Sequence, residues 1–336
     1  MAFNRRSVLR LAALGLATAT LSSATLAQQL PAVPAASGLR LTLLGTAGGP
    51  PPHIDRSQPA SLLQVDGKSY LIDAGENVGQ QTLRAGVPPS RIDATFITHL
   101  HWDHVLGLGY LMATGWMMGR TVPMSVIGPP GLSTYVKSET AALGVGEDIF
   151  RPQMPSRQAL AGLYPVQEVN LAGPAEIFHD EKVRVTAVPG SHFGTVRGAP
   201  HAYGVDKAYA YRFDTAFGSV TFTGDTGPSD AVTALAHGSD ILVSEICDVD
   251  SMRKALVAAE GPGARLDALI AHMQEEHLSP EAVGRMASAA GARKLVLSHF
   301  VMGRGVDPQS LVAKVRLFYA GEIIAGQDLT TIDIGR

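Results

Sequence analysis

One short segment of the sequence concentrates side chains that bind metal ions. The segment HLHWDH at residues 99–104 places three imidazoles and a carboxylate within six residues, directly after an apolar stretch that predicts a strand. Such nitrogen and oxygen donors suit borderline divalent ions, zinc above all. On a loop, His99 and His101 can converge on one ion while Asp103 and His104 reach a second. The segment therefore predicts a site for two metal ions.

Three further predicted strands each end beside a side chain that can bind a metal. These strands and side chains are Val183–Val188 with His192, Val220–Thr223 with Asp225, and Leu295–Ser298 with His299. Active sites of α/β proteins form at strand ends because the sheet holds the side chains there rigidly. Any one of these residues alone could be an ordinary core histidine or turn aspartate. Together with the 99–104 segment, they predict one shared metal site.

The elements that must position these residues alternate between strands and helices, which predicts an α/β fold. Asp66-Gly67 lies between two apolar runs, and this dipeptide is a strong signal for a hairpin turn. A helix is predicted over Pro280–Ala290, with Ser279 as its N-cap and Gly291 after its last turn. No repeat of fixed period and no linker interrupts the pattern, so we expect one domain at residues 39–336.

The composition excludes several classes of protein. Of the 336 residues, 46% are hydrophobic and 17% charged, so the chain can bury enough apolar surface to fold and is not intrinsically disordered. Its one cysteine, Cys247, can form neither an internal disulfide nor a thiolate metal cluster. Metal binding must therefore come from the eleven histidines and from carboxylates.

The first residues have the pattern of an export signal. Three arginines within residues 5–10, two of them adjacent, precede a mild apolar run at 11–19, and small residues lead to Ala27. This order is typical of a signal peptide, and the adjacent arginines resemble the twin-arginine type. The apolar run is too short to span a bilayer. We therefore expect a signal peptide at residues 1–27 and a flexible lead-in at 28–38.

Cleavage of that signal would make the protein periplasmic or secreted, with no membrane span in its mature form. Removing the three arginines also makes the chain more acidic than its formal charge of −3. Long nucleic acids bind basic surfaces through their phosphates. We therefore expect no nucleic acid partner, and instead a small anionic ester substrate that the metal ions attract.

In its motifs and their order, the sequence resembles the metallo-β-lactamase superfamily over nearly all of the chain after the signal. The segments that carry the resemblance are Gly45-Thr46-Ala47-Gly48, Asp73-Ala74-Gly75-Glu76, Thr98–His104, His192, Gly224-Asp225-Thr226 and Ser298-His299-Phe300. The resemblance implies an αββα sandwich of two mixed β-sheets flanked by helices, and two bound Zn²⁺ ions. The implied ligands are His99, His101 and His192 for the first ion, Asp103, His104 and His299 for the second, and Asp225 between them.

The motifs are most similar to the ribonuclease Z and arylsulfatase-like branch of that superfamily. The residues that carry this similarity are Asp73-Ala74-Gly75-Glu76 with Gln81, and His277 ahead of a helix that leads to Leu297-Ser298-His299-Phe300. In ribonuclease Z-like enzymes the residues that match His277 and Glu245 assist the leaving group, so the candidate catalytic residues are Asp103, His277 and Glu245. The branch implies a hydrolase that cleaves small phosphodiester or aryl sulfate esters by attack of a hydroxide bridging the metals.

The resemblance leaves some positions open. His201 follows nine residues after His192 and could replace it as a ligand, although His192 comes directly after a strand rich in β-branched residues. The basic, Gly/Pro-rich arm of ribonuclease Z is not visible between Ala141 and Glu181, which argues against processing of transfer RNA. The other histidines, interpreted as surface or supporting residues, are His53, His179, His237 and His272.

Alternatives remain for the function, the metal and the entrance to the site. The protein could be a lactonase or β-lactamase of the same superfamily, or a metal-binding protein without catalysis. Mn²⁺ or iron could replace zinc, since the donors admit all three. A homodimer would be ordinary in this superfamily. The segment 106–120, with Trp116, Met117 and Met118, is either an apolar entrance or a buried helix.

Overall fold

The computed structural model describes residues 38–194 and 201–334 of the chain. The predicted signal peptide at residues 1–27, and the lead-in as far as residue 37, lie outside the described residues. Within the described part, no helix combines the length and the apolar composition that crossing a bilayer requires.

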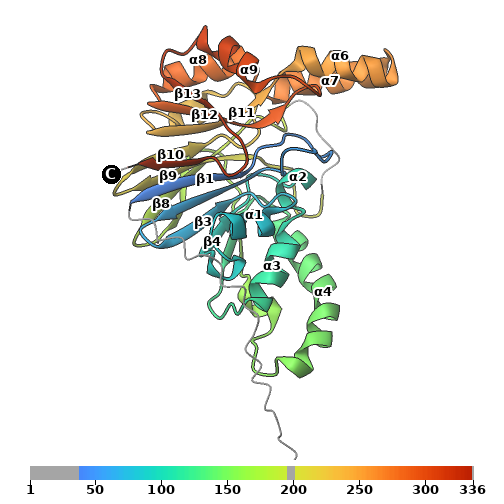
Figure 1. The fold of residues 1–336 in the computed structure, drawn as a ribbon, viewed down its shortest axis with the longest axis vertical. Helices are drawn as coiled ribbons and strands as arrows, with labels where there is room; N and C mark the ends of the chain where they lie inside the picture. Colours follow the sequence, from blue (N-terminus) through green and yellow to red (C-terminus); the bar gives the residue numbers. More distant parts are fainter. Residues whose placement is uncertain (1–37, 195–200, 335–336) are drawn as a thin grey trace, which may run out of the picture. The chain divides into compact units, whose positions relative to one another are not determined.

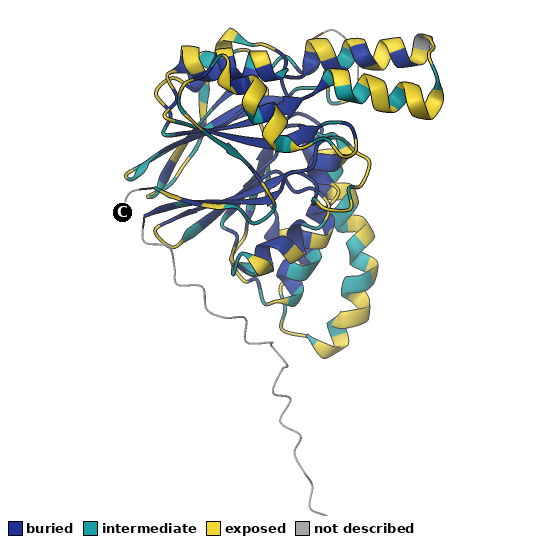
Figure 2. Ribbon diagram, turned by 45° about the horizontal axis from the view of Figure 1, so that its top comes forward, coloured by how far each residue is buried: buried dark blue, intermediate teal, exposed yellow. Residues whose placement is uncertain are grey.

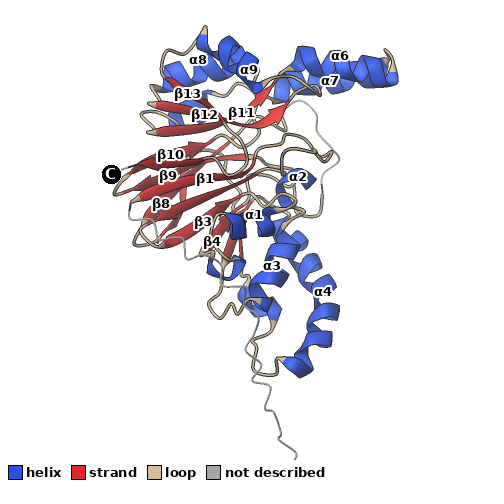
Figure 3. Ribbon diagram, viewed as in Figure 1, coloured by secondary structure: helices blue, strands red, loops and turns tan. Residues whose placement is uncertain are grey.

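Two mixed β-sheets form the centre of the fold (Figure 1, Figure 3), and each has seven strands within the described ranges. The first sheet consists, in spatial order, of β14 (Thr331–Ile334), β1 (Leu39–Gly45), β2 (Ala60–Val65), β3 (Lys68–Ile72), β4 (Ala94–Phe96), β5 (Ser125–Gly128) and β6 (Val166–Glu168). The second consists of β13 (Glu322–Ala325), β12 (Lys294–Val301), β11 (Ile241–Cys247), β10 (Gly218–Phe222), β9 (Tyr209–Thr215), β8 (Val183–Pro189) and β7 (Ala175–His179).

Each sheet is antiparallel on one side and parallel on the other. In the first sheet β14 to β3 pair antiparallel, whereas β3 to β6 pair parallel. In the second sheet β7 to β10 pair antiparallel, whereas β10 to β13 pair parallel. Parallel strands need a crossover connection, usually a helix, so the parallel halves carry the helical cover.

Helices cover the outer side of each sheet (Figure 1). Against the first sheet lie α1 (Val78–Arg84), α2 (Trp102–Val105), α3 (Leu108–Met117) and α4 (Leu132–Phe150). Against the second lie α5 (Asp230–Leu235), α8 (Pro280–Ala290) and α9 (Pro308–Arg316). Two more helices, α6 (Val249–Glu260) and α7 (Ala264–Glu276), pack on each other and on the ends of β11 and β12. Short 3-10 helices occupy Pro89–Arg91, Arg151–Gln153 and Leu160–Leu163.

The two sheets pack face to face, and their strands consist mostly of buried residues (Figure 2). Alternate residues of a strand point to opposite sides of its sheet. In β12, Val296 lies in the core between the sheets, whereas Leu295 and Leu297 lie in the core under the outer helices. The strands therefore have apolar residues on both faces, as strands covered on both sides require. This arrangement confirms the expected αββα sandwich.

Several local predictions are confirmed. Asp66 and Gly67 both have positive φ, 44° and 92°, as the two-residue turn between β2 and β3 requires. Helix α8 begins after Ser279, whose side chain accepts a hydrogen bond from the Ala282 amide, and it ends at Gly291. The segment 106–120 contains the helix α3. Its Trp116 is buried, as the packing alternative expects, whereas Met118 is exposed.

Candidate metal centre

The seven predicted ligands come together at one edge of the two sheets. Residues 99–104 follow β4 of the first sheet and run into α2. His192 follows β8, Asp225 follows β10, and His299 lies in β12, all in the second sheet. All seven side chains except that of His101 are buried. The site is thus built by loops that leave two different sheets.

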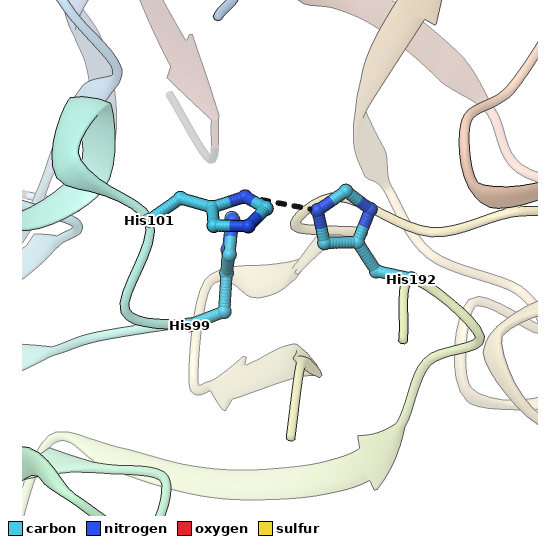
Figure 4. Close-up of side chains that lie close together, drawn as sticks. All are labelled: His99, His101 and His192. Carbon is cyan, nitrogen blue, oxygen red and sulfur yellow. Dashed lines mark hydrogen bonds between the residues drawn. The ribbon is translucent and has the colours of Figure 1, made fainter. Parts of the chain in front are cut away.

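His99, His101 and His192 form the first group (Figure 4). The His192 Nε2 atom lies 3.1 Å from the His101 Nδ1 atom, and one nitrogen from each of the three rings lies within 4.8 Å of the others. Three imidazoles in this arrangement are a common protein ligand set for one zinc ion.

Asp103, His104 and His299 form the second group. An Asp103 carboxylate oxygen lies 3.6 Å from His104 Nε2 and 3.4 Å from His299 Nε2. Asp225 lies between the two groups. Its Oδ2 atom is 3.9 Å from the Nε2 atoms of His99 and His192 and 3.2 Å from that of His299. One carboxylate is thus placed to contact two ions at once.

Several donor atoms of this cluster have no hydrogen-bond partner among the described residues, as expected of atoms that bind a metal ion. Five of these atoms are fully buried yet make no hydrogen bond within the described residues: His99 Nε2, His104 Nε2, His299 Nε2, Asp103 Oδ1 and Asp225 Oδ1. A buried polar atom without a partner costs free energy, so such atoms are rare in folded proteins. Five of them facing the same small volume are what two bound cations would satisfy.

Hydrogen bonds on the far side of the rings fix how the ligands are aimed. Asp73 accepts from His104 Nδ1 at 2.9 Å, and the Thr98 hydroxyl lies 3.1 Å from His99 Nδ1. The backbone carbonyl of Glu276 accepts from His192 Nδ1 at 2.9 Å. Each contact leaves the Nε2 atom directed at the centre. Partners of this kind are usual behind metal-binding histidines and set their tautomer.

The charges inside the cluster also favour cation binding. Burial acts to raise the pKa of Asp103, but His104 and His299 outweigh it and lower that pKa to about 2. Burial lowers the pKa of His192 to about 3. The carboxylate is therefore ionised and this imidazole neutral at ordinary pH, which are the forms that bind a metal.

Beside the metal ligands, His277 and Glu245 form a buried pair. His277 Nδ1 donates to Glu245 Oε2 at 2.6 Å, and the Thr226 amide donates to Glu245 Oε1 at 2.6 Å. Burial opposes a charge on His277, but Glu245 and Asp225 outweigh it and raise its pKa to about 9. His277 stacks on the His299 ring at 6.1 Å, which places a protonated imidazole beside the site.

The structure also places the histidines that the sequence left open. His192, not His201, lies in the first group, since His201 is exposed and stacks on Tyr203. His272 was interpreted as a surface or supporting residue, and its position agrees with a supporting residue: its ring lies 5.6 Å from that of His192 and 5.4 Å from that of His277. The Glu276 carboxylate lies 2.6 Å from His272 Nδ1. The four-residue spacing of this pair on a helix was the available signal.

Comparison with known proteins agrees with the fold. Residues 68–300 match the model of the β-lactamase superfamily domain. A ribonuclease Z of Mycobacterium sp. (strain KMS) is 31% identical over 304 residues, which cover 88% of this chain and 96% of that relative. A ribonuclease Z of Mycobacterium bovis (strain BCG / Pasteur 1173P2) is 30% identical over 305 residues, covering 88% and 98%. The chain therefore belongs to the metallo-β-lactamase superfamily.

Within that superfamily, both of these relatives are ribonuclease Z proteins. Among solved structures, human tRNase Z, short form, has a TM-score of 0.62 at 21% identity and covers 88% of this chain and 99% of its own. The metallo-β-lactamase fold protein YhfI from Bacillus subtilis has a TM-score of 0.60 at 19% identity, covering 88% and 100%. These two similarities establish the fold. Together, the family and the site define a metal-dependent hydrolase.

Proposed function

We propose that this protein is an exported phosphodiesterase that uses two divalent metal ions, zinc in the first instance. The observation that carries the proposal is the juxtaposition of the seven-residue His/Asp cluster with the buried His277–Glu245 pair. The cluster accounts for binding two cations, and the pair beside it supplies a candidate proton donor. Hydrolysis of an ester needs a nucleophile, and a leaving group that departs as an alcohol also needs a proton.

The side chains divide this work between them. Two bound ions would supply hydroxide near neutral pH and neutralise charge on a phosphoryl group. Glu245, held by the Thr226 amide, keeps the His277 ring in place and keeps it protonated. As the bond between phosphorus and the leaving oxygen breaks, His277 donates its Nε2 proton to that oxygen. Asp103 belongs to the ligand set, and its expected catalytic part is to hold the second ion.

The kind of ester is argued from the relatives and from the proton donor. Ribonucleases cleave phosphodiester bonds whose leaving group is an alcohol, and the relatives at 30–31% identity carry that name. An alcohol is a poor leaving group, so an acid beside the site favours alkyl phosphodiesters over aryl sulfates. The relatives also weaken the expectation that nucleic acid is not a partner, so RNA belongs among the substrates to be tested.

The test begins with metal analysis of the purified protein without residues 1–27. We expect about two equivalents of zinc, with manganese and iron measured alongside. Hydrolysis is then measured with bis(4-nitrophenyl) phosphate, 4-nitrophenyl sulfate, a homoserine lactone, a chromogenic cephalosporin and a short RNA. We expect turnover of the phosphodiester. Exclusive turnover of the sulfate, the lactone or the cephalosporin contradicts the proposal, and two metals without any turnover supports a binding protein.

Export is tested separately, because the predicted signal lies outside the described residues. We expect the full-length protein to appear in the periplasm with a new N-terminus near residue 28. Replacing both Arg5 and Arg6 with Lys should retain it in the cytoplasm, since twin-arginine signals depend on that pair. An unprocessed N-terminus on wild-type protein would contradict export.

A further inference from the structure

A cavity opens beside the first group of histidines. It is lined by Leu100, His101, Pro130, Phe193, Tyr203, Asp206 and Lys207, and its volume is about 160 Å³. A cavity of about 150 Å³ with apolar walls is large enough to hold a benzene molecule. His101, a proposed ligand of the first ion, is part of the lining. A group that occupies the cavity therefore lies next to the proposed metal site.

One aromatic wall of the cavity is fixed to the metal cluster. The Phe193 ring lies 5.2 Å from the His101 ring, 4.9 Å from that of His192 and 5.9 Å from that of His99. At 81° to His101, it makes an edge contact rather than a stack. Phe193 thus contacts every histidine of the first group and also faces the cavity.

Tyr203 provides a second aromatic side chain, held from two directions. Its ring stacks on His201 with centroids 4.7 Å apart and planes at 14°, and its hydroxyl donates to Asp206 at 3.0 Å. A Cβ atom on Gly131 would lie 3.1 Å from this ring, and Gly131 has a φ of 98°. Only glycine combines that backbone conformation with room for the tyrosine. The wall is therefore ordered by the packing around it.

The cavity also offers a positive charge. Lys207 donates one hydrogen bond, at 2.9 Å, to the Leu171 carbonyl, and an ammonium group has three N–H donors. Asp206 already accepts from Tyr203 and lies 3.5 Å from His201 Nε2. Aromatic side chains combined with a cation suit a flat ring that is attached to an anion.

We infer that this cavity binds an aromatic ring carried by the phosphodiester substrate, either a nucleobase or an aryl group. The inference rests on the proposed phosphodiesterase function. His277 and Glu245 line no part of the cavity, and under the proposed function His277 protonates the leaving oxygen. The ring in the cavity therefore belongs to the ester group that stays on phosphorus, not to the group that leaves.

This orientation can be tested with diesters that share one leaving group. 4-Nitrophenyl phenyl phosphate, 4-nitrophenyl ethyl phosphate and thymidine 5′-(4-nitrophenyl) phosphate all release 4-nitrophenolate and differ only in the group that is retained. We expect kcat/KM for the better ring-bearing diester to exceed that for the ethyl diester by roughly tenfold. A preference for the thymidine diester over the phenyl diester identifies a nucleobase, and the opposite order identifies an aryl group.

Variants locate the preference in the cavity. Phe193→Leu should reduce the preference for a ring-bearing diester to about twofold or less, mainly through KM. Because Phe193 touches three proposed ligands, metal content is measured on this variant. The described contacts of Tyr203 are with His201 and Asp206, which are not proposed ligands. If Phe193→Leu loses metal, the ring preference of Tyr203→Ala is therefore the measurement that tests the cavity assignment. Phe150→Leu, at the end of α4 and outside the cavity lining, is the matched control and should behave as wild type.

The possible failures are distinguishable. Equal kcat/KM for the ethyl diester and both ring-bearing diesters, with turnover intact, overturns the cavity assignment and leaves the phosphodiesterase proposal standing. An unchanged ring preference in both Phe193→Leu and Tyr203→Ala also overturns it. Absence of turnover with any diester, while two metals are bound, overturns the proposed function, and the cavity assignment falls with it.

Discussion

Replacing Glu245 with Gln tests the proton-donor role of His277 with the smallest change in shape. In the wild-type protein, the Thr226 amide donates to Oε1 and His277 Nδ1 donates to Oε2, both at 2.6 Å. A glutamine would keep its oxygen on the Thr226 amide and turn its NH₂ group towards His277. Two donors would then meet, so His277 Nδ1 must lose its proton. The ring becomes a neutral imidazole, which is a much weaker acid.

The size of the effect depends on the leaving group. General acid catalysis contributes about a hundredfold to ten-thousandfold, and a hundredfold loss corresponds to about 2.7 kcal/mol in the barrier. We expect a loss in that range for a diester that expels an alcohol. For a diester that expels 4-nitrophenolate, which departs without a proton, we expect less than about tenfold. The assay compares kcat for the two substrates in the Glu245→Gln variant at a fixed pH.

Metal content and a matched variant complete the experiment. Glu281→Gln removes an exposed carboxylate that pairs with Arg285 on α8, and it should leave both rates unchanged. Glu245→Gln should retain about two equivalents of metal, because Glu245 is outside the proposed ligand set. Equal losses for both leaving groups, or activity restored by added zinc, would refute the assignment of His277 as the acid.

Three further outcomes can be measured on the same protein. Asp225→Ala should lose most of both metals in elemental analysis, because Asp225 lies between the two groups; retention of both would contradict a bridging role. Asp73→Asn should weaken metal binding about tenfold to a hundredfold in chelator competition, because it removes the carboxylate that accepts a hydrogen bond from His104. Unchanged metal affinity would contradict this role of Asp73. Burial, with Glu245 and Asp248 nearby, raises the pKa of the Cys247 thiol, so Ellman's reagent at pH 8 should label it only after unfolding.

Metal ligands that are close in sequence could be predicted from the sequence, because their relation is local. The 99–104 segment folds as a loop and one helical turn, so its donors face one centre wherever the segment lies. Asp225 could be placed because it follows a strongly apolar strand, and His299 because it lies near the end of another. His192 needed the structure to settle its competition with His201, since both follow β8 along the chain.

Contacts that depend on how distant segments pack could not be predicted in the same way. Helix α7 had a usable signal, since Leu266, Ile270 and Met273 have helical spacing and are buried. That spacing says nothing of where the helix docks, and only docking brings His272 beside His192. The pairing of β14 with β1 joins segments from opposite ends of the chain, and no local pattern specifies it.

The ligands are divided between the two sheets, so a bound ion would connect the first sheet to the second. Each proposed ion takes two ligands from the 99–104 segment and one of its own from the second sheet, either His192 or His299. Asp225, which lies between the two groups, also comes from the second sheet. Neither sheet holds a complete set, so tight binding requires that both sheets have formed and docked. Binding of metal by these two sets is therefore coupled to the docking of the two sheets.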